Sequence, residues 1–250
     1  TKTSMKKIVL FFVALVGTFS MAFAQKPDAG DITAEMNLNL TNLGLFHGNG
    51  NGTGNPFSLN NDANQIRMRY FISPSLAARL GLNINANSTK QNFTENADGT
   101  GATGNARQGS FGMVLTPGIE KHFAGGEKLS TYAGADLILD FKSYNEKWEN
   151  SDGNAYVADQ KAEVSGGYAS GNERSYFGVG LRAVAGADYY FTEKLYIGAE
   201  FGWGFLMKSE SEKTTKVTAG GQSSETKSPG GSNFNLAPAI NTGLRLGFRF

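Results

Sequence analysis

Hydrophobic and polar residues alternate with a period of two along much of the chain. From Phe234 to Phe250 every second residue is apolar or nearly so, whereas the residues between them include Arg245 and Arg249. A period of two sustained over this length is typical of a β-strand with one apolar and one polar face. We therefore predict a strand over residues 234–250 that ends at the last residue of the sequence.

The same alternation predicts seven further strands. Each is near or above the roughly 9 to 11 residues that a tilted strand needs to cross a bilayer. They cover residues 30–40, 64–72, 76–86, 108–123, 129–141, 175–191 and 195–205. The connections alternate between long segments (41–63, 87–107, 142–174 and 206–232) and short ones (73–75, 124–128 and 192–194). Strands joined in this way form an antiparallel up-and-down meander with all short turns at one end.

The eight amphipathic strands and the terminal Phe250 resemble the outer-membrane β-barrel domain family of small OmpA-like and OmpX-like proteins of Gram-negative bacteria. The resemblance covers residues 25–250 and implies an all-β fold, an eight-stranded antiparallel up-and-down transmembrane β-barrel in the cell outer membrane. It also implies outer-membrane lipid, lipopolysaccharide, periplasmic chaperones and the barrel-assembly machinery as partners. Phe248 and Phe250 would then form the C-terminal assembly signal.

The amino-terminal segment is typical of an exported protein. A basic start, Met5 to Lys7, precedes an apolar run from Ile8 to Phe23, and Ala22-Phe23-Ala24 fits a small-x-small cleavage site. We predict that residues 1–24 are a signal peptide that is removed; the alternative is a retained helical anchor. Its loss would lower the basic residues from 23 to 20 against 22 acidic ones, so the net charge of about −2 indicates no nucleic-acid partner.

A soluble barrel with its apolar face inward would show the same alternation, so the polar face must decide between the two. That face carries much glycine and all of Arg67, Arg69, Arg79, Arg182 and Arg245, which suits a cramped interior. An arginine that faces lipid costs roughly 2 to 4 kcal/mol near the bilayer midplane. Slipping the strands by one residue would expose all five, at a summed cost of roughly 10 kcal/mol. We therefore place the arginines inside and the apolar side chains against lipid.

If eight strands close, the lumen is barely wide enough for its own side chains. We predict that paired charges fill it, although the sequence leaves open which acid meets which arginine. The predicted lumen residues are Glu35, Arg67, Arg69, Arg79, Glu120, Asp136, Asp140, Arg182, Asp188, Glu200 and Arg245. The alternative to this structural network is a gated, narrow path through the barrel.

The sequence offers little from which to build an enzyme or a cofactor site. It contains no Cys, its two histidines are His47 and His122, and no G-x-S-x-G or H-E-x-x-H motif occurs. An enzyme at the outer rim, with His47 near Ser58 or Asp62, is the weaker alternative. Two fragments of a calcium-loop pattern carry too few carboxylates for that ion. We therefore expect no catalytic residue, no metal and no cofactor.

The four long connections would form the external surface. They are rich in Gly, Asn, Ser, Thr and charge, and the third adds Tyr144, Trp148, Tyr156 and Tyr168. Aromatic residues on a polar loop suit contact with a protein or glycan ligand. Alternatively, they pack together as a cap, or the strands extend above the membrane. We predict a non-enzymatic outer-membrane barrel with a structural or adhesin-like role through these loops, and a small-solute channel as the alternative.

Overall fold

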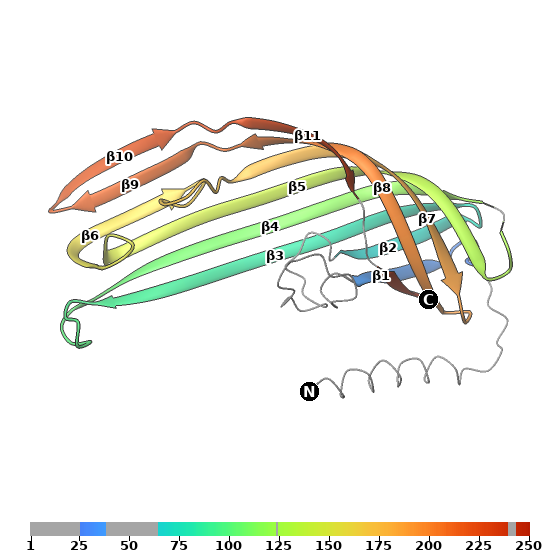
Figure 1. Ribbon diagram of the computed structural model, residues 1–250, viewed down its shortest axis with the longest axis horizontal. Helices are drawn as coiled ribbons and strands as arrows, with labels where there is room; N and C mark the ends of the chain where they lie inside the picture. The colour runs from blue at the N-terminus through green and yellow to red at the C-terminus, as the bar shows by residue number, and fades with distance from the viewer. Residues whose placement is uncertain (1–25, 39–64, 124, 240–243) are drawn as a thin grey trace, which may run out of the picture.

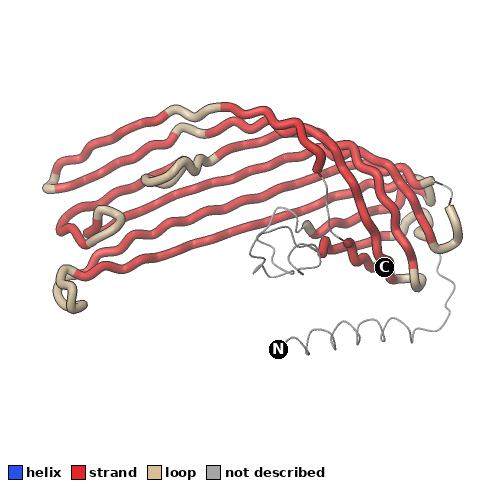
Figure 2. Tube along the Cα trace, in the orientation of Figure 1, coloured by secondary structure: helices blue, strands red, loops and turns tan. Residues whose placement is uncertain are grey.

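In the computed structural model, the described part of the chain comprises residues 26–38, 65–123, 125–239 and 244–250, and its regular elements are β-strands (Figures 1 and 2). The strands are β1 (Ile32–Leu38), β2 (Ile66–Ser73), β3 (Leu76–Thr94), β4 (Thr103–His122), β5 (Leu129–Ser151), β6 (Tyr156–Ser165), β7 (Tyr176–Tyr190), β8 (Leu195–Glu210), β9 (Lys213–Ala219), β10 (Gln222–Ser228), β11 (Ser232–Ala239) and β12 (Leu244–Arg249). The predicted signal peptide and the first long connection, which contains His47, lie outside the described residues. Within the described ranges, no helix has the length and apolar character needed to cross a membrane, a finding that does not bear on strands.

Eight of the strands close into a ring. β1, β2, β3, β4, β5, β7, β8 and β12 each pair antiparallel with the next, and β12 pairs back onto β1. At the closure, Glu35 of β1 stands opposite Gly247 of β12. The order around the ring follows the order in the chain, which is an up-and-down meander. The predicted all-β fold, an eight-stranded antiparallel barrel, is thereby confirmed.

The predicted last strand is described in two parts. β11 pairs with the later part of β8, and β12 pairs with the earlier segment Leu195–Ala199 of the same strand. The residues between the two parts, 240–243, lie outside the description. Both parts keep the predicted phase, since Phe234 of β11 and Leu246 of β12 are exposed.

The outer face of the ring is apolar and its inner face is polar, as predicted. Leu181 and Trp203, for example, are 52% and 54% exposed. Along β7, exposed and buried residues alternate without interruption from Phe177 to Ala185. A water-soluble barrel would bury such apolar side chains, whereas here the buried face carries the charges. The inside-out arrangement is that of a barrel surrounded by lipid.

The three predicted short turns lie together at one end of the barrel (Figure 1). Only Pro74 and Ser75 separate β2 from β3, and four residues, Phe191 to Lys194, separate β7 from β8. The third turn joins β4 to β5 over residues 123–128, of which residue 124 lies outside the description. These boundaries agree with the predicted ones to within one or two residues.

At the other end, three of the four long connections contain strands. β3 continues to Thr94 and β4 begins at Thr103, so the segment predicted as a loop over 87–107 is mostly a strand hairpin. Strand β5 continues to Ser151 and is followed by β6, within the predicted loop 142–174. Strands β9 and β10 occupy much of the predicted loop 206–232. Of the alternatives left open for these segments, extension of the strands is the one observed, and they extend beyond the ring.

The extended strands form a wall that stands beyond the ring, which we call the outer wall (Figure 1). Its order is β3, β4, β5, β6, β9 and β10. Strand β5 pairs with β7 up to Lys142 and with β6 from Asn145 onward, so β6 takes the place of β7 beyond the ring. In the same way, β9 continues the line of β8, and β10 precedes β11 in line (Figure 1).

The outer wall escaped prediction because its strands have no continuous apolar face. β9 and β10 read KTTKVTA and QSSETKS, in which hydrophobic alternation is absent. A strand with polar residues on both faces shows no hydrophobic period of two for sequence analysis to detect. These strands are joined instead by backbone pairing, which runs in unbroken register from Lys213 opposite Ser228 to Ala219 opposite Gln222.

Candidate functional site

The lumen of the ring is filled by buried charged side chains. Five arginines and five carboxylates share it, and none of the ten is more than 9% exposed. We call them the lumen charges; they are Glu35, Arg67, Arg69, Arg79, Glu120, Asp136, Arg182, Asp188, Glu200 and Arg245. Every strand of the ring contributes at least one of them. The eleventh predicted residue, Asp140, is also buried but pairs with Lys208, whose Nζ lies 3.0 Å from Asp140 Oδ2.

Glu200 of β8 is the acceptor for two arginines at once. Arg79 Nη1 and Nη2 donate hydrogen bonds to its two oxygens at 2.9 and 3.0 Å. Arg67 does the same from β2, with both distances 3.0 Å. The hydroxyl of Tyr132 donates a further bond of 2.7 Å to Glu200 Oε2. Bidentate bonds between guanidinium and carboxylate are among the strong hydrogen bonds of proteins, so this carboxylate is fixed from three directions.

Glu35 and Asp188 form a second centre. Glu35 accepts hydrogen bonds from Arg67 and Arg69, both at 2.8 Å, and from Arg245 at 3.0 Å. Asp188 accepts from Arg69 at 2.6 Å and from Arg245 at 2.7 Å. Because Arg67 contacts both Glu35 and Glu200, the two centres are parts of one network.

Asp136 ties the remaining arginine into the same network. It stands directly opposite Arg182 in the register of β5 and β7, and Arg182 Nε donates to Asp136 Oδ2 at 3.1 Å. Arg79 Nη2 reaches the same oxygen at 3.2 Å. The ionic network therefore extends around the whole inner face of the ring.

Aromatic rings and glycines complete the filling of the lumen. The guanidinium of Arg69 lies over the rings of Tyr132 and Tyr196, at 5.1 and 5.6 Å from their centroids. A Cβ atom at Gly247 would overlap the ring of Tyr196, and one at Gly198 would overlap the carboxylate of Asp188. Glycine is thus required at both positions because the neighbouring side chains already occupy the space.

This arrangement fills the lumen with matched charges. A buried charge is tolerated when it is paired and hydrogen-bonded, and removing one partner of such a pair typically costs about 3–5 kcal/mol. The five positive and five negative lumen charges balance each other. Most of their oxygens and terminal nitrogens are directed at one another, so the network is suited to hold the ring together.

One group within the lumen has the composition of a catalytic triad. His122 Nδ1 lies 2.8 Å from Ser130 Oγ, and its Nε2 lies 2.9 Å from Glu120 Oε1. All three residues are buried, with Ser130 only 2% exposed, and Glu120 also pairs with Arg69 and Arg79. A nucleophile must be reachable by its substrate. We therefore assign this group to the structural network; sequence analysis missed it, although Glu120 and His122 share one face of β4.

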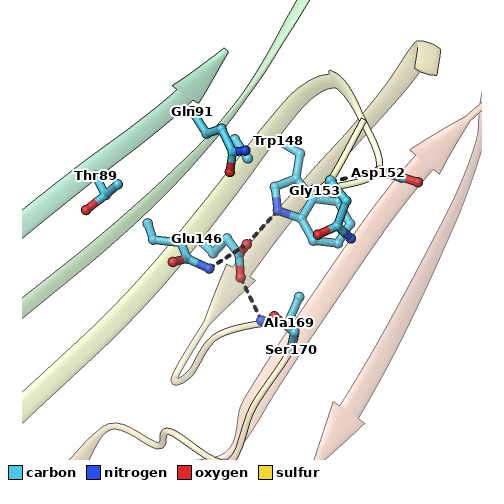
Figure 3. Close-up of a pocket in the computed structure, with 11 residues that line it drawn as sticks. Thr89, Gln91, Glu146, Trp148, Asp152, Gly153, Ala169 and Ser170 are labelled. Carbon is cyan, nitrogen blue, oxygen red and sulfur yellow. Dashed lines mark hydrogen bonds between the residues drawn. The ribbon is translucent and has the colours of Figure 1, made fainter. Parts of the chain in front are cut away.

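A second feature is a cavity of about 320 Å³ on the outer wall, which we call the outer pocket (Figure 3). Its lining residues are Thr89, Gln91, Ala106, Gln108, Glu146, Trp148, Asp152, Gly153, Asn154, Ala169 and Ser170. At its centre, the buried carboxylate of Glu146 accepts hydrogen bonds from the Trp148 indole at 2.7 Å and from the backbone N–H of Ala169 at 2.7 Å. Gln108 Nε2 donates a third, at 3.2 Å.

The turn between β5 and β6 forms one side of the outer pocket. Asp152 Oδ1 accepts hydrogen bonds from the backbone N–H groups of Asn154 and Ala155 at 2.9 and 2.8 Å. These bonds hold the pKa of the exposed Asp152 carboxyl below its ordinary value, because they stabilise the charged form. The turn brings Gly153, at φ +97°, against the ring of Trp148.

Of the four aromatic residues predicted for surface contact, Trp148 alone lines this cavity. Tyr144 and Tyr168 pack edge to face, with ring centroids 5.1 Å apart, and Tyr156 begins β6 half-buried. The amide residues of the pocket were missed because they lay in or beside a predicted loop. Residues 87–92, Asn-Ser-Thr-Lys-Gln-Asn, show no alternation of hydrophobic and polar residues, so this part of β3 carried no signal that could have revealed the pocket.

Phe248 and Phe250, predicted as an assembly signal, lie at the end of β12. Their rings pack edge to face with centroids 5.0 Å apart, and Phe250 is 69% exposed on the outer face. The role of the two residues as an assembly signal stays a prediction.

Comparison with known proteins agrees with this architecture. The model of the "Putative OmpA-OmpF-like porin family" matches residues 54–250. A solved structure, the outer membrane protein OprG from Pseudomonas aeruginosa, is 10% identical and covers 92% of this chain and 99% of that chain, with a TM-score of 0.34. At that score the assignment of the fold rests on the strand pairing of this chain and not on OprG. No curated protein matches the sequence. Because the matched segment takes in most of the sequence, the chain belongs to the OmpA-OmpF-like porin family and is an outer-membrane β-barrel protein.

Proposed function

We propose that this protein is a non-enzymatic outer-membrane barrel that is closed to solutes and acts through its outer wall. The observation that carries the proposal is the layer of lumen charges, in which arginines and carboxylates from opposite strands meet at hydrogen-bond distance. An eight-stranded barrel has an interior that side chains can fill completely. A filled, neutral and cross-linked interior supports a structural role in the membrane.

The second part of the proposal concerns the outer wall. Outer-membrane barrels keep short turns in the periplasm and long segments outside, so we take the outer wall to face the exterior of the cell. Six strands there support a largely polar surface that offers contact to other molecules. We infer that this surface serves interaction with the surroundings of the cell.

The test is single-channel recording of the purified barrel in a planar lipid bilayer. A closed lumen predicts no sustained openings at moderate voltage, in 1 M salt, from protein whose folded state is verified by its heat-dependent gel mobility. Sustained and reproducible openings from such protein would contradict the closed lumen.

Those openings would support the second candidate, a small-solute channel. The observation that favours it is membership of a family described as porin-like. In that case the ionic network would have to rearrange, because its present bonds join opposite sides of the barrel. Voltage-dependent opening would be the expected signature, since moving the paired charges apart requires work.

A further inference from the structure

We infer that the outer pocket binds a neutral saccharide unit of a glycan. This inference deepens the surface role proposed for the outer wall and rests on it, but it does not depend on whether the lumen conducts. It is carried by the arrangement of the pocket floor, by the two turns that enclose it and by the chemistry of its free groups.

The floor consists of two rows of side chains across neighbouring strands. Thr89 of β3, Gln108 of β4 and Glu146 of β5 are directly paired in the sheet register and form one row. Gln91, Ala106 and Trp148 form the next row, two residues along each strand. Side chains two residues apart point to the same face of a sheet, so all six lie on one surface. This surface continues the inner face of the ring beyond the lumen charges.

Two turns enclose the floor and fix its central residues (Figure 3). The turn after β5 lays Gly153 on the ring of Trp148, where a Cβ would come within 2.7 Å of ring carbons. The connection after β6 brings the N–H of Ala169 onto Glu146. Because Glu146 also holds the indole N–H of Trp148, the ring has one fixed orientation before any ligand arrives. A preformed site avoids the entropy cost of ordering its side chains on binding.

The free groups of the pocket match the hydroxyl groups of a sugar. The side chains of Thr89, Gln91, Asn154 and Ser170 line the cavity and make no hydrogen bond to any described residue. Amides and hydroxyls both donate and accept, as sugar hydroxyls do. The half-buried indole of Trp148 offers an aromatic surface for the C–H groups of a pyranose ring. The volume of about 320 Å³ lies at the small end of the roughly 300–1,000 Å³ found for ligand sites.

The charges of the pocket argue against other ligands. None of its lining residues is a lysine or an arginine, so phosphate and acidic sugars would find no counter-ion. Both oxygens of Glu146 already accept hydrogen bonds, Oε1 from Trp148 and Gln108 and Oε2 from Ala169, which disfavours a cation at this carboxylate. No group of three or more acidic or histidine side chains suited to a metal occurs among the described residues. Asp152, the second carboxylate of the lining, has its Oδ1 occupied by two backbone N–H groups, so these groups together favour a neutral polyol.

The test uses Trp148 as its own reporter. The chain contains two tryptophans, and Trp203 lies on the lipid-facing side of β8, so Trp203→Phe leaves only the pocket residue. This variant, folded in detergent, is titrated with the methyl glycosides of glucose, galactose, mannose and N-acetylglucosamine. We expect a saturable change in fluorescence with at least one of them. Gln91→Ala should weaken that binding about tenfold, the effect of one lost hydrogen bond.

The matched control is Asn92→Ala, an amide on the opposite face of the same strand, which should leave binding unchanged. Both variants must keep the heat-dependent gel mobility of the folded barrel, so that a loss of binding is not a loss of fold. No saturable response to any glycoside from folded protein would overturn the inference. So would a preference for glucuronic acid over the neutral sugars, or an equal effect of Gln91→Ala and Asn92→Ala.

A second binding experiment identifies the source of the glycan. Binding of the delipidated polysaccharide of lipopolysaccharide from the same cells would assign the ligand to the cell's own surface. Binding of the glycosides without that polysaccharide would assign it to glycans outside the cell. Conductance of the lumen, tested separately, would overturn the closed barrel while leaving these binding results in force.

Discussion

Arg79 and Glu200 form a bidentate ion pair across the full width of the ring. Their strands, β3 and β8, are four steps apart in either direction around the eight strands, yet the two nitrogen–oxygen distances are 2.9 and 3.0 Å. Arg69 of β2 and Asp188 of β7 are also on opposite strands and form a second bridge at 2.6 Å. The ring is therefore braced through its centre as well as held by backbone bonds between neighbouring strands.

Removal of one end of the first bridge should destabilise the barrel strongly. Glu200→Ala leaves Arg67 and Arg79 buried without this acid, and losing one partner of a buried pair costs about 3–5 kcal/mol. Changing both Arg79 and Glu200 to Leu should lower the free energy of unfolding by less than the sum of the two single Leu variants. The double variant removes both charges of the pair, so neither is left buried without the other. Urea unfolding followed by tryptophan fluorescence measures both effects.

The control for this comparison of single and double variants is Lys147→Ala. Lys147 pairs with Glu163 at 2.9 Å on the exposed outer wall, where an ion pair contributes little to stability. It should unfold at the same urea concentration as the unchanged protein. If the losses of unfolding free energy in Arg79→Leu and Glu200→Leu simply added up in the double variant, the pair would not act as one unit.

Truncation of both ends of the bridge should open the lumen. Arg79→Ala combined with Glu200→Ala removes side chains from opposite walls at one level of the barrel, so water and small ions gain a path. We expect short, frequent openings in planar bilayers, whereas a closed lumen predicts none from the unchanged protein. Gln222→Ala on β10, far from the lumen, serves as the control and should stay silent. A folded double variant without openings would show that other lumen charges suffice for closure.

A methyl group at Gly247 should interfere with packing in the lumen. The added Cβ of Gly247→Ala would overlap the ring of Tyr196, and overpacking of a filled interior costs about 1–3 kcal/mol. Gly126→Ala, at a short turn where no atom lies within 4 Å of the new Cβ, should have no effect. The comparison is made by urea unfolding, and equal stability of the two variants would contradict the account of a filled lumen.

The strands of the ring and the side of each that faces lipid could be predicted from the sequence. The reason is physical, because an arginine on the lipid face is so costly that the phase of each strand has one acceptable choice. The buried positions of Arg67, Arg182 and Arg245 follow directly from that choice. Strand type and phase are local properties, and a pattern of period two records them.

The partners within the lumen could not be predicted in the same way. Which acid Arg79 reaches depends on the tilt and stagger of eight strands, and these are properties of the closed ring. The outer pocket was hidden for a different reason. Its floor residues Gln91 and Gln108 lie where the apolar half of the alternation fades, so polar strand and polar loop have similar sequences.

An arginine on the lipid face should reveal the membrane depth of the ring. Leu181 lies near the middle of β7 and is 52% exposed on the outer face. Leu181→Arg should lower the free energy of unfolding in lipid vesicles by about 2–4 kcal/mol if this level is the bilayer midplane. Ser224→Arg on the exposed β10 should have no measurable effect. A tolerated arginine at position 181 would place that level at the membrane interface instead.

Acid should loosen the turn between β5 and β6, which forms one side of the outer pocket. The pKa of Asp152 is lowered in the folded protein by the N–H groups of Asn154 and Ala155, so this carboxylate stabilises the turn above its ordinary pKa of 3.8. The stabilisation is lost as the pH falls through the lower, folded value. NMR of the labelled barrel should show the amides of Asn154 and Ala155 shifting together with a midpoint below pH 3.8, while Asp152→Asn removes this titration. A midpoint above 3.8 would show that the two bonds do not favour the charged form of Asp152.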